Sequence, residues 1–253
     1  MFDWLTGLVA PPLPLEAAQR MRLARLQGGR ANGGSMEKWS NVALDDARWA
    51  VADVESSGLD LSRDQLIAIG AVVVAGRMVA LAESFEIVLK QEQVSTNDNI
   101  LIHRIVGQQQ IAGADPADAL LSFLEFVGDS PMVAYHAPFD ARMIERACRR
   151  YLGVDPGLQW LDLANVAPAL QGRAGQAGQA LGEFENRRNS RGLDWWLDHY
   201  AIKIASRHNA AADALGTAQL LIALLPACAA QGHHTIGALV KLSDEFQWLQ
   251  SRR

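Results

Sequence analysis

The order of its apolar and amphipathic segments predicts that this chain folds as an α/β protein, with helices packed on a mixed β-sheet. Short apolar runs typical of buried strands come first, over residues 49–54 and 66–89, and a turn-like Ala-Gly-Arg at 75–77 divides the second run. Helical periodicity then alternates with further short strand patterns. Strands followed by such alternation are typical of a mixed sheet covered by helices.

The individual elements follow from local patterns. The divided run over 66–89 predicts an antiparallel hairpin. Residues 114–128 have helical periodicity after an Asp-Pro start, and residues 131–140 have the pattern of a short strand that ends in a turn. The remaining segments predict an amphipathic helix over 140–152, a short strand over 160–166, a long polar surface loop over 171–192, and helices over 192–202, 209–225 and 235–249.

The two ends of the chain are expected to flank one main domain. Residues 1–48 form an N-terminal extension, with a helix-favouring stretch at 15–27 and a glycine-rich turn or linker at 28–35. The main domain is expected to span residues 49–228, and residues 229–253 to form a final helix packed on it. The extension either docks on the domain or recruits a partner, and the sequence does not choose.

Length and composition narrow the class of protein. The 253 residues allow one sizeable domain plus an extension, or two small domains. The formal net charge of -5 argues against a wholesale basic coat for nucleic acid, although local arginines can still contact phosphates. The two cysteines, Cys148 and Cys228, fit neither a disulfide framework nor a metal site, which favours a reducing compartment. We expect no apolar run near the roughly 20 residues that span a bilayer, so a cytoplasmic protein without membrane contact is predicted.

Two carboxylates interrupt the first apolar run. Asp53 and Glu55 lie two positions apart on a predicted strand, so both side chains point to the same face. Burying two unpaired charges costs several kcal/mol each, which is tolerable where cations or strong donors meet them. Mg²⁺ and Mn²⁺ are the obvious candidates, because oxygen ligands suit hard divalent ions. For this pair alone, two solvated carboxylates at a strand end are the alternative.

Two further motifs carry candidate site residues. The segment VAYHAPFD ends a predicted strand and brings Asp140 to the turn before a helix, where active-site residues often lie. In RHNAAADALG, His208 precedes Asp213 by five residues at a predicted helix start, a spacing that allows both to face one site. Taken alone, these two residues are better explained as a surface histidine and a solvated helix position.

In order and in spacing, these motifs resemble those of the DEDDh 3′–5′ exonucleases, a family that includes the proofreading ε subunit of bacterial DNA polymerase III and ribonuclease T. The stretch ADVESSGLDLSRDQLIAIGAV is similar to the first family motif, VAYHAPFD to the second, and HNAAAD to the third. The resemblance runs from about residue 49 to residue 225. It implies a ribonuclease H-like fold, with a central five-stranded mixed sheet that has one antiparallel strand and is flanked by helices.

The chain departs from the family's usual residues in three places. Ser-Ser-Gly at 56–58 stands where the family usually has Thr-Thr-Gly, so a hydroxyl is kept for contact with a terminal nucleotide. Tyr135 and His136 stand where it usually has His-Asn. The segment around His103 is similar to the family's Ile-His-Gly-Ile, but Arg104 replaces the glycine. No ligand position is lost, and handling of the 3′ end is expected to differ.

The acidic residues of the three motifs suit phosphodiester hydrolysis. That reaction needs an activated water, neutralised charge at the phosphate and a stabilised leaving group, which two metal ions can supply together. We expect Asp53, Glu55 and Asp213 to be direct ligands of two Mg²⁺ or Mn²⁺ ions, with Asp140 completing the second ion's shell directly or through water. His208 is the expected general base, because histidine is the side chain that titrates near neutrality.

The resemblance also implies contacts to the terminal nucleotide. The residues concerned are Ser57, Gly58, Leu59 and His103, with Phe139 near the base of that nucleotide. Ordinary core packing is the alternative for Phe139, and capping of a loop is the alternative for His103.

The predicted function is stepwise hydrolysis of the terminal phosphodiester bond at a 3′ end, preferably of single-stranded DNA, with release of nucleoside 5′-monophosphates. An RNA 3′-end-processing exonuclease of the same fold is the second interpretation. The third is a catalytically silent subunit that binds nucleic acid or a polymerase, and such a subunit is expected to have lost a ligand. The expected partners are a nucleic-acid 3′ end and a polymerase or repair protein.

Overall fold

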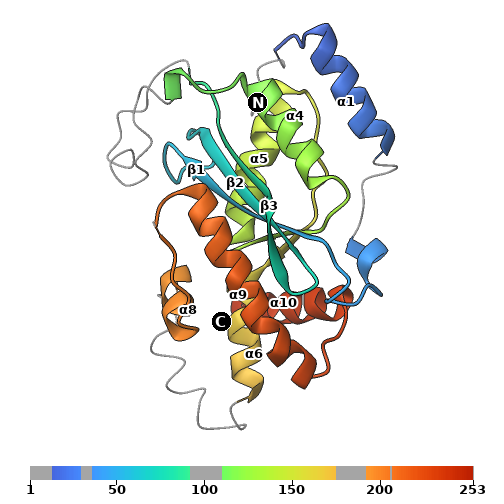
Figure 1. Cartoon of the computed structure of the whole chain (residues 1–253), viewed down its shortest axis with the longest axis vertical. Helices are drawn as coiled ribbons and strands as arrows, with labels where there is room; N and C mark the ends of the chain where they lie inside the picture. Colours follow the sequence, from blue (N-terminus) through green and yellow to red (C-terminus); the bar gives the residue numbers. More distant parts are fainter. Residues whose placement is uncertain (1–12, 30–35, 92–109, 175–191, 206, 253) are drawn as a thin grey trace, which may run out of the picture.

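The computed structural model describes residues 13–29, 36–91, 110–174, 192–205 and 207–252, and its core is a five-stranded sheet in the order β3-β2-β1-β4-β5 (Figure 1). The strands are β1 (Trp49–Ser56), β2 (Leu66–Ala75), β3 (Met78–Val88), β4 (Met132–Ala134) and β5 (Trp160–Asp162). Strand β2 pairs antiparallel with both β1 and β3, whereas the β1–β4 and β4–β5 pairs are parallel. This confirms the mixed sheet with one antiparallel strand.

The hairpin expected over residues 66–89 is formed by β2 and β3. Two left-handed residues make its turn, Gly76 at φ 56° and Arg77 at φ 63°. Two successive positive φ values match the right-handed twist of the flanking strands. Arg77 is held there by a two-point contact with Asp45, because its Nε and Nη2 donate to the two carboxylate oxygens at 2.5 and 2.8 Å.

The pleat of β1 divides its side chains between two hydrophobic clusters. Val51 belongs to the cluster that packs against α9 (Ala210–Ala230), while Ala52 and Val54 belong to the cluster on the other face. That second face is covered by α4 (Pro116–Val127) and α5 (Ala137–Tyr151). Strand β1 is therefore buried between two layers of helices, and the two faces of the sheet lead to different helices.

Helix α4 begins as its Asp-Pro start predicts. The Asp115 side chain accepts the backbone N–H groups of Ala117 and Asp118, and Pro116 occupies the first helical position. An aspartate cap satisfies donors that the first turn of a helix leaves without partners, and proline there lacks the donor that would be wasted.

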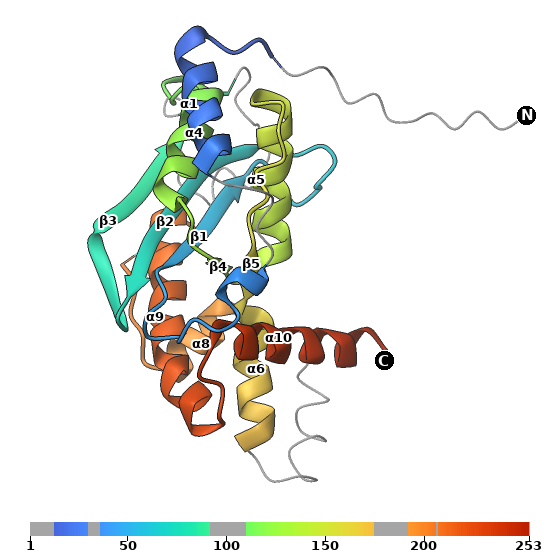
Figure 2. The ribbon, with the colours of Figure 1, turned by 90° about the vertical axis from the view of Figure 1, so that its right-hand side faces the viewer.

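The strand expected over residues 160–166 is shorter than predicted. It ends at Asp162, and α6 (Leu163–Ala174) begins at once, because the Asp162 carboxylate accepts the Ala164 N–H at 2.9 Å. Helix α6 also takes in residues 171–174 of the expected polar loop, whose residues 175–191 lie outside the described part. The three helices expected toward the C-terminus are α8 (Leu193–His199), α9 and α10 (Ile236–Ser251). Figure 2 shows α10 crossing beside α6.

Helix α9 corrects the expectation that no apolar run approaches membrane-spanning length. By length and composition, its residues Ala210–Ala230 suffice to cross a bilayer. In this fold 56% of the most apolar 18 residues of α9 are buried, and its apolar residues contribute to the cluster on one face of the sheet. A buried core helix of a globular domain meets the same criteria, so the length of α9 is weak evidence for a membrane.

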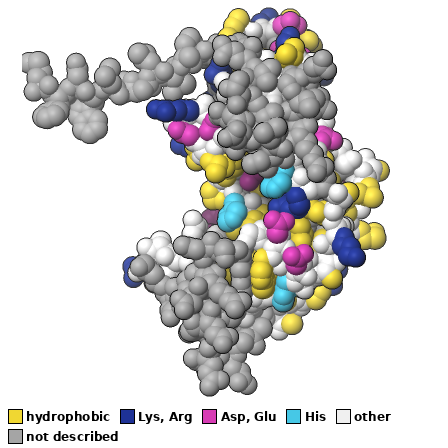
Figure 3. Space-filling model, turned by 90° about the vertical axis from the view of Figure 1, so that its left-hand side faces the viewer, with side chains coloured by type: hydrophobic (Ala, Val, Ile, Leu, Met, Phe, Trp, Pro, Cys, Tyr) yellow, Lys and Arg dark blue, Asp and Glu magenta, His cyan; other side chains and the backbone are white. Residues whose placement is uncertain are grey.

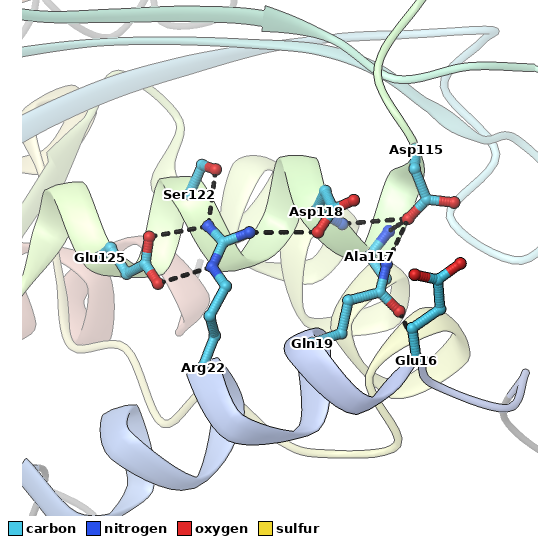
Figure 4. Close-up of polar contacts among 8 residues, drawn as sticks. All are labelled: Glu16, Gln19, Arg22, Asp115, Ala117, Asp118, Ser122 and Glu125. Carbon is cyan, nitrogen blue, oxygen red and sulfur yellow. Dashed lines mark hydrogen bonds and ion pairs between the residues drawn. The ribbon is translucent and has the colours of Figure 1, made fainter.

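The described part of the N-terminal extension docks on the domain. Helix α1 (Ala17–Gly29) lies beside α4, where Arg22 donates to both carboxylate oxygens of Glu125 at 2.8 and 2.7 Å (Figure 4). Arg22 also reaches Asp118 and Ser122, and Gln19 donates to the cap Asp115 at 3.0 Å. A short 3₁₀ turn, η1 (Met36–Trp39), leads on toward β1.

The C-terminal helix shares its core with the sheet. Ile236, Leu239 and Leu242 of α10 belong to the same cluster as Val51 of β1 and the buried face of α9. The boundary expected between residues 228 and 229 falls inside α9, which ends at Ala230. The division of the chain into an extension, a domain and a C-terminal helix stays a prediction.

Candidate active site

The candidate site starts at the carboxyl end of β1. Because alternate residues of a strand share a face, Asp53 and Glu55 continue the row of Val51 toward α9. Opposite them on β2 lie Gly70, paired with Asp53, and Ala68, paired with Glu55. The register shifts immediately after Glu55, so the regular ladder ends where the acidic pair is presented.

The start of α9 brings the third carboxylate. Asn209 caps this helix by accepting the Ala212 N–H at 2.9 Å, which places Asp213 in the first turn. The Asp213 side chain turns back along the chain, and its Oδ2 accepts the His208 N–H at 3.0 Å. His208 has a left-handed backbone, with φ 60°, and an exposed side chain.

Together these segments form a cluster of three carboxylates. One oxygen each from Asp53, Glu55 and Asp213 lies within 4.8 Å of the others. Burial and the charges of Asp140, Asp213 and Glu55 raise the pKa of the Asp53 carboxyl well above its usual range. Burial likewise raises the pKa of Asp213, although the neighbouring Arg207 opposes that shift. Mutual repulsion of this kind is relieved by a cation.

Asp140 lies outside this group of three and reaches β1 from α5. It is buried in the first turn of α5, and its Oδ1 accepts the Val54 N–H at 3.0 Å, between Asp53 and Glu55. Burial raises the pKa of Asp140 well above its usual range, and the charges of Asp162 and Glu55 act in the same direction. The fourth carboxylate of the sequence prediction is therefore tied directly to the strand that carries the first two.

The turn before α5 explains one departure from the family's motif. His136 precedes the helix with φ 68° and ψ 44°, in the left-handed region. Asparagine, the family's usual residue there, and histidine are both enriched in that region. Asp162 at the end of β5 holds the turn, because its Oδ1 accepts the His136 N–H at 2.9 Å.

The loop after β1 contains three of the predicted substrate contacts. The Ser57 hydroxyl donates to Asp64 at 2.8 Å and accepts the Gln65 N–H at 2.9 Å, so it is engaged within the loop. Gly58 lies against the same carboxylate, where a Cβ would come within 2.3 Å of Asp64 Oδ2. Leu59 is 82% exposed, as a contact to a ligand from solution requires.

The other two predicted substrate contacts have different outcomes. Phe139 is partly buried and packs against the α4–α5 cluster, which matches the alternative of ordinary core packing. His103 lies outside the described residues.

Sequence reasoning missed two residues that shape the site. Gly70 allows the first turn of α9 to touch β2, since a Cβ there would lie 2.2 Å from the Ala210 carbonyl carbon. Arg207 forms ion pairs with both Asp213 and Asp194. A glycine inside an apolar strand is a signal of close backbone approach, whereas nothing in the sequence pairs Arg207 with a particular carboxylate.

Histidine, acidic and basic side chains lie next to one another near the middle of the face shown in Figure 3, which is the side of the molecule where α8 and the start of α9 lie in Figure 1.

The chemistry of the carboxylate cluster suits a hard divalent ion. Its donors are all carboxylate oxygens, which Mg²⁺ and Mn²⁺ prefer, and they come from a rigid strand and a capped helix. The residues present therefore fit the metal that the sequence predicts.

A five-stranded mixed sheet flanked by helices, with carboxylates gathered at the end of its central strand, defines a ribonuclease H-like α/β domain. The family model of exonucleases named RNase_T matches residues 50–221, and the chain belongs to this exonuclease family. The match spans the three motifs, and the resemblance to DEDDh exonucleases is thereby confirmed.

Two sequence relatives are PolC-type DNA polymerases III. The chain is 27% identical over 220 residues to the one from Staphylococcus aureus, covering 85% of this chain and 14% of that protein. It is 24% identical over 203 residues to the one from Thermotoga maritima, covering 80% of this chain and again 14% of the relative. The chain thus corresponds to a small part of these polymerases.

Solved structures of nucleases share the fold. Escherichia coli exonuclease I in complex with a dT13 oligonucleotide superposes with a TM-score of 0.59 at 16% identity, over 74% of this chain and 42% of that one. Cell-death related nuclease 4 also has a TM-score of 0.59, at 12% identity, over 72% of this chain and 64% of that one. At these identities the likeness concerns the fold.

Proposed function

We propose that this protein is a divalent-metal-dependent 3′–5′ exonuclease that releases nucleoside 5′-monophosphates from single-stranded DNA ends. The observation that carries the proposal is the convergence of Asp53, Glu55 and Asp213 within 4.8 Å of one another. Membership of the exonuclease family supports the reaction class. The oligonucleotide complex of exonuclease I and the polymerase relatives support DNA as the substrate.

In this proposal the four acidic side chains hold the metal ions. Asp53, Glu55 and Asp213 would hold two Mg²⁺ or Mn²⁺ ions, and Asp140 would complete one shell directly or through water. Bound there, the ions would make a water nucleophilic and neutralise the charge that develops on the phosphate. The hydrogen bonds from Val54 to Asp140 and from His208 to Asp213 fix two of these carboxylates before anything binds.

His208 is the proposed general base. Its backbone N–H donates to Asp213 and its side chain is exposed, which supports a role in taking a proton from the attacking water. Ser57, Gly58, Leu59, His103 and Phe139 stay predictions as contacts to the terminal nucleotide.

The reaction is tested on 5′-labelled single-stranded DNA with a free 3′-hydroxyl. Degradation from the 3′ end, requiring Mg²⁺ or Mn²⁺ and yielding 5′-monophosphates, is expected. Asp53→Ala and Asp213→Ala should abolish it, while Asp198→Ala, an exposed position on α8, serves as the matched control. Activity that persists in excess chelator or in both cluster variants would contradict the metal-dependent mechanism.

Two further arms refine the proposal. Matched DNA and RNA strands compared under one condition decide the sugar preference, and faster RNA degradation would favour the 3′-end-processing interpretation. His208→Ala should lower turnover far more than metal affinity, and equal losses of both would identify a structural histidine. The silent-subunit interpretation predicts no turnover of either strand, although all five motif residues are present.

The cellular setting is proposed on the same basis. We propose a cytoplasmic location and a polymerase or repair partner, and the similarity to DNA polymerases III supports both. The chain corresponds to 14% of the length of those relatives. Co-purification with the full chain tests for such a partner.

A further inference from the structure

The side chain of Arg207 brings a positive charge to the carboxylate cluster. Its Nη1 pairs with Asp213 Oδ1, and its Nε pairs with Asp194 in the first turn of α8. The three partners differ in exposure, since the Asp213 side chain is 8% exposed, that of Arg207 29% and that of Asp194 67%. Arg207 therefore connects the buried cluster to a solvated carboxylate on another helix.

Both oxygens of Asp213 are engaged in this arrangement. Oδ2 accepts the His208 N–H at 3.0 Å, and Oδ1 faces the Arg207 guanidinium. Asp213 is also one of the three residues whose oxygens converge within 4.8 Å. A divalent ion that binds those oxygens must accordingly approach a carboxylate that a fixed cation already neutralises.

We propose that Arg207 is a built-in counter-ion of the carboxylate cluster, which stabilises the metal-free protein and competes with the divalent ion for Asp213. Asp194 is a second acidic partner outside the cluster. The guanidinium therefore stays close to the cluster when a divalent ion binds Asp213. The inference rests on the proposed metal site and adds a residue that sets how tightly the site binds its ion.

Arg207 and a divalent ion are two positive charges that compete for the same carboxylate. The attraction between Arg207 and the cluster stabilises the fold while the carboxylates are otherwise uncompensated. A bound divalent ion compensates the carboxylates itself and is repelled by the guanidinium. Arg207 therefore lowers the affinity of the cluster for the ion. A purely structural arginine would contribute equally with and without the ion.

The test combines metal binding with unfolding of the full chain. Mn²⁺ affinity is measured by calorimetry for the wild type and Arg207→Gln, and thermal unfolding is followed in EDTA and in saturating Mn²⁺. Arg207→Gln should bind Mn²⁺ about tenfold more tightly, the order expected for repulsion between a unit charge and a divalent ion at a partly exposed site. Its unfolding midpoint should fall by about 2 to 6 °C in EDTA and by clearly less in Mn²⁺.

Two matched variants separate charge from packing. Arg207→Lys keeps the charge and should retain near-wild-type stability in EDTA. Arg142→Gln removes an exposed arginine whose ion pair is with Glu145 on the same helix, and it should change neither quantity. Circular dichroism of each variant checks that the fold is kept.

These measurements separate a failure of the counter-ion role of Arg207 from a failure of the proposed metal site. If the wild type binds no Mn²⁺ and resembles Asp53→Ala in calorimetry, the metal site itself is wrong and the role of Arg207 falls with it. If the wild type binds Mn²⁺ but Arg207→Gln binds it equally or more weakly, only the counter-ion role is overturned. An equal loss of stability with and without Mn²⁺ would also overturn it.

Discussion

A methyl group on Gly70 would lie 2.2 Å from the carbonyl carbon of Ala210, closer than real Cβ atoms approach another atom. Gly70 is the β2 partner of Asp53, and Ala210 is the first residue of α9. The absence of a side chain at one position of β2 therefore decides how near the turn that carries Asp213 comes to the strand that carries Asp53.

Replacing Gly70 by alanine should push the start of α9 away from β2. We expect a loss of about 1–3 kcal/mol in the free energy of unfolding, as for other overpacked cores, together with loss of Mn²⁺ binding as the cluster spreads. Denaturant unfolding and calorimetry measure the two effects. Gly172→Ala is the matched control, because that glycine in α6 has open space around its Cβ position and alanine favours a helix there. A Gly70→Ala protein with unchanged stability would contradict the close approach.

The hydrogen bond from Val54 to Asp140 allows structure and charge to be separated at one position. Asp140→Ala leaves the buried Val54 N–H without its acceptor, so a loss of about 1–3 kcal/mol in unfolding free energy is expected. Asp140→Asn keeps an acceptor oxygen and removes the charge, so it should be more stable than Asp140→Ala while nuclease activity falls in both. Equal stability of the two variants in denaturant would show that this hydrogen bond contributes nothing.

The left-handed backbone at His136 restricts which residues the turn accepts. His136→Asn should leave stability within about 0.5 kcal/mol, because asparagine tolerates φ 68°. His136→Val should cost about 1–2 kcal/mol or more, since a branched Cβ clashes with the following carbonyl in this region. Chemical denaturation of the three proteins side by side provides the measurement, and a valine variant as stable as the asparagine variant would refute the argument.

Burial of the two thiols should make the protein less stable at alkaline pH and should protect both thiols from reagents in the folded state. Burial raises the pKa of the Cys228 thiol to about 12. A raised pKa in the folded state gives stability that is complete below the unfolded thiol's value of about 8.5 and is lost as the pH rises toward about 12. Native protein at pH 8 should therefore leave Cys148 and Cys228 unreactive toward a thiol reagent, and both should react after unfolding.

The matching control is Cys228→Ala, which should show a shallower loss of stability between pH 9 and 12 than the wild type. Some loss should remain, because burial also raises the pKa of Tyr135 to about 12. Rapid labelling of two thiols in the native protein would contradict the burial of both side chains.

Much of the fold was predictable because local patterns and global packing agree. The apolar runs of β1 to β3, the turn at Gly76 and the Asp115 cap each specify their element through short-range geometry. The predicted end of the strand after Asp162 was wrong, since Leu163, Ala164 and Val166 continue the apolar run, whereas the structure begins α6 there with Asp162 accepting the Ala164 N–H.

By itself the sequence determined which residues are the candidates for the chemistry, because carboxylates in an apolar strand and the spacing of three motifs are local properties of the chain. Tertiary structure alone decided how those residues meet. The contact of Gly70 with Ala210, the bond from Val54 to Asp140 and the pairing of Arg207 with Asp213 and Asp194 depend on how separate elements approach one another. Periodicity reports which face of an element is buried, whereas the partner that meets a given side chain is set by the packing of the whole domain.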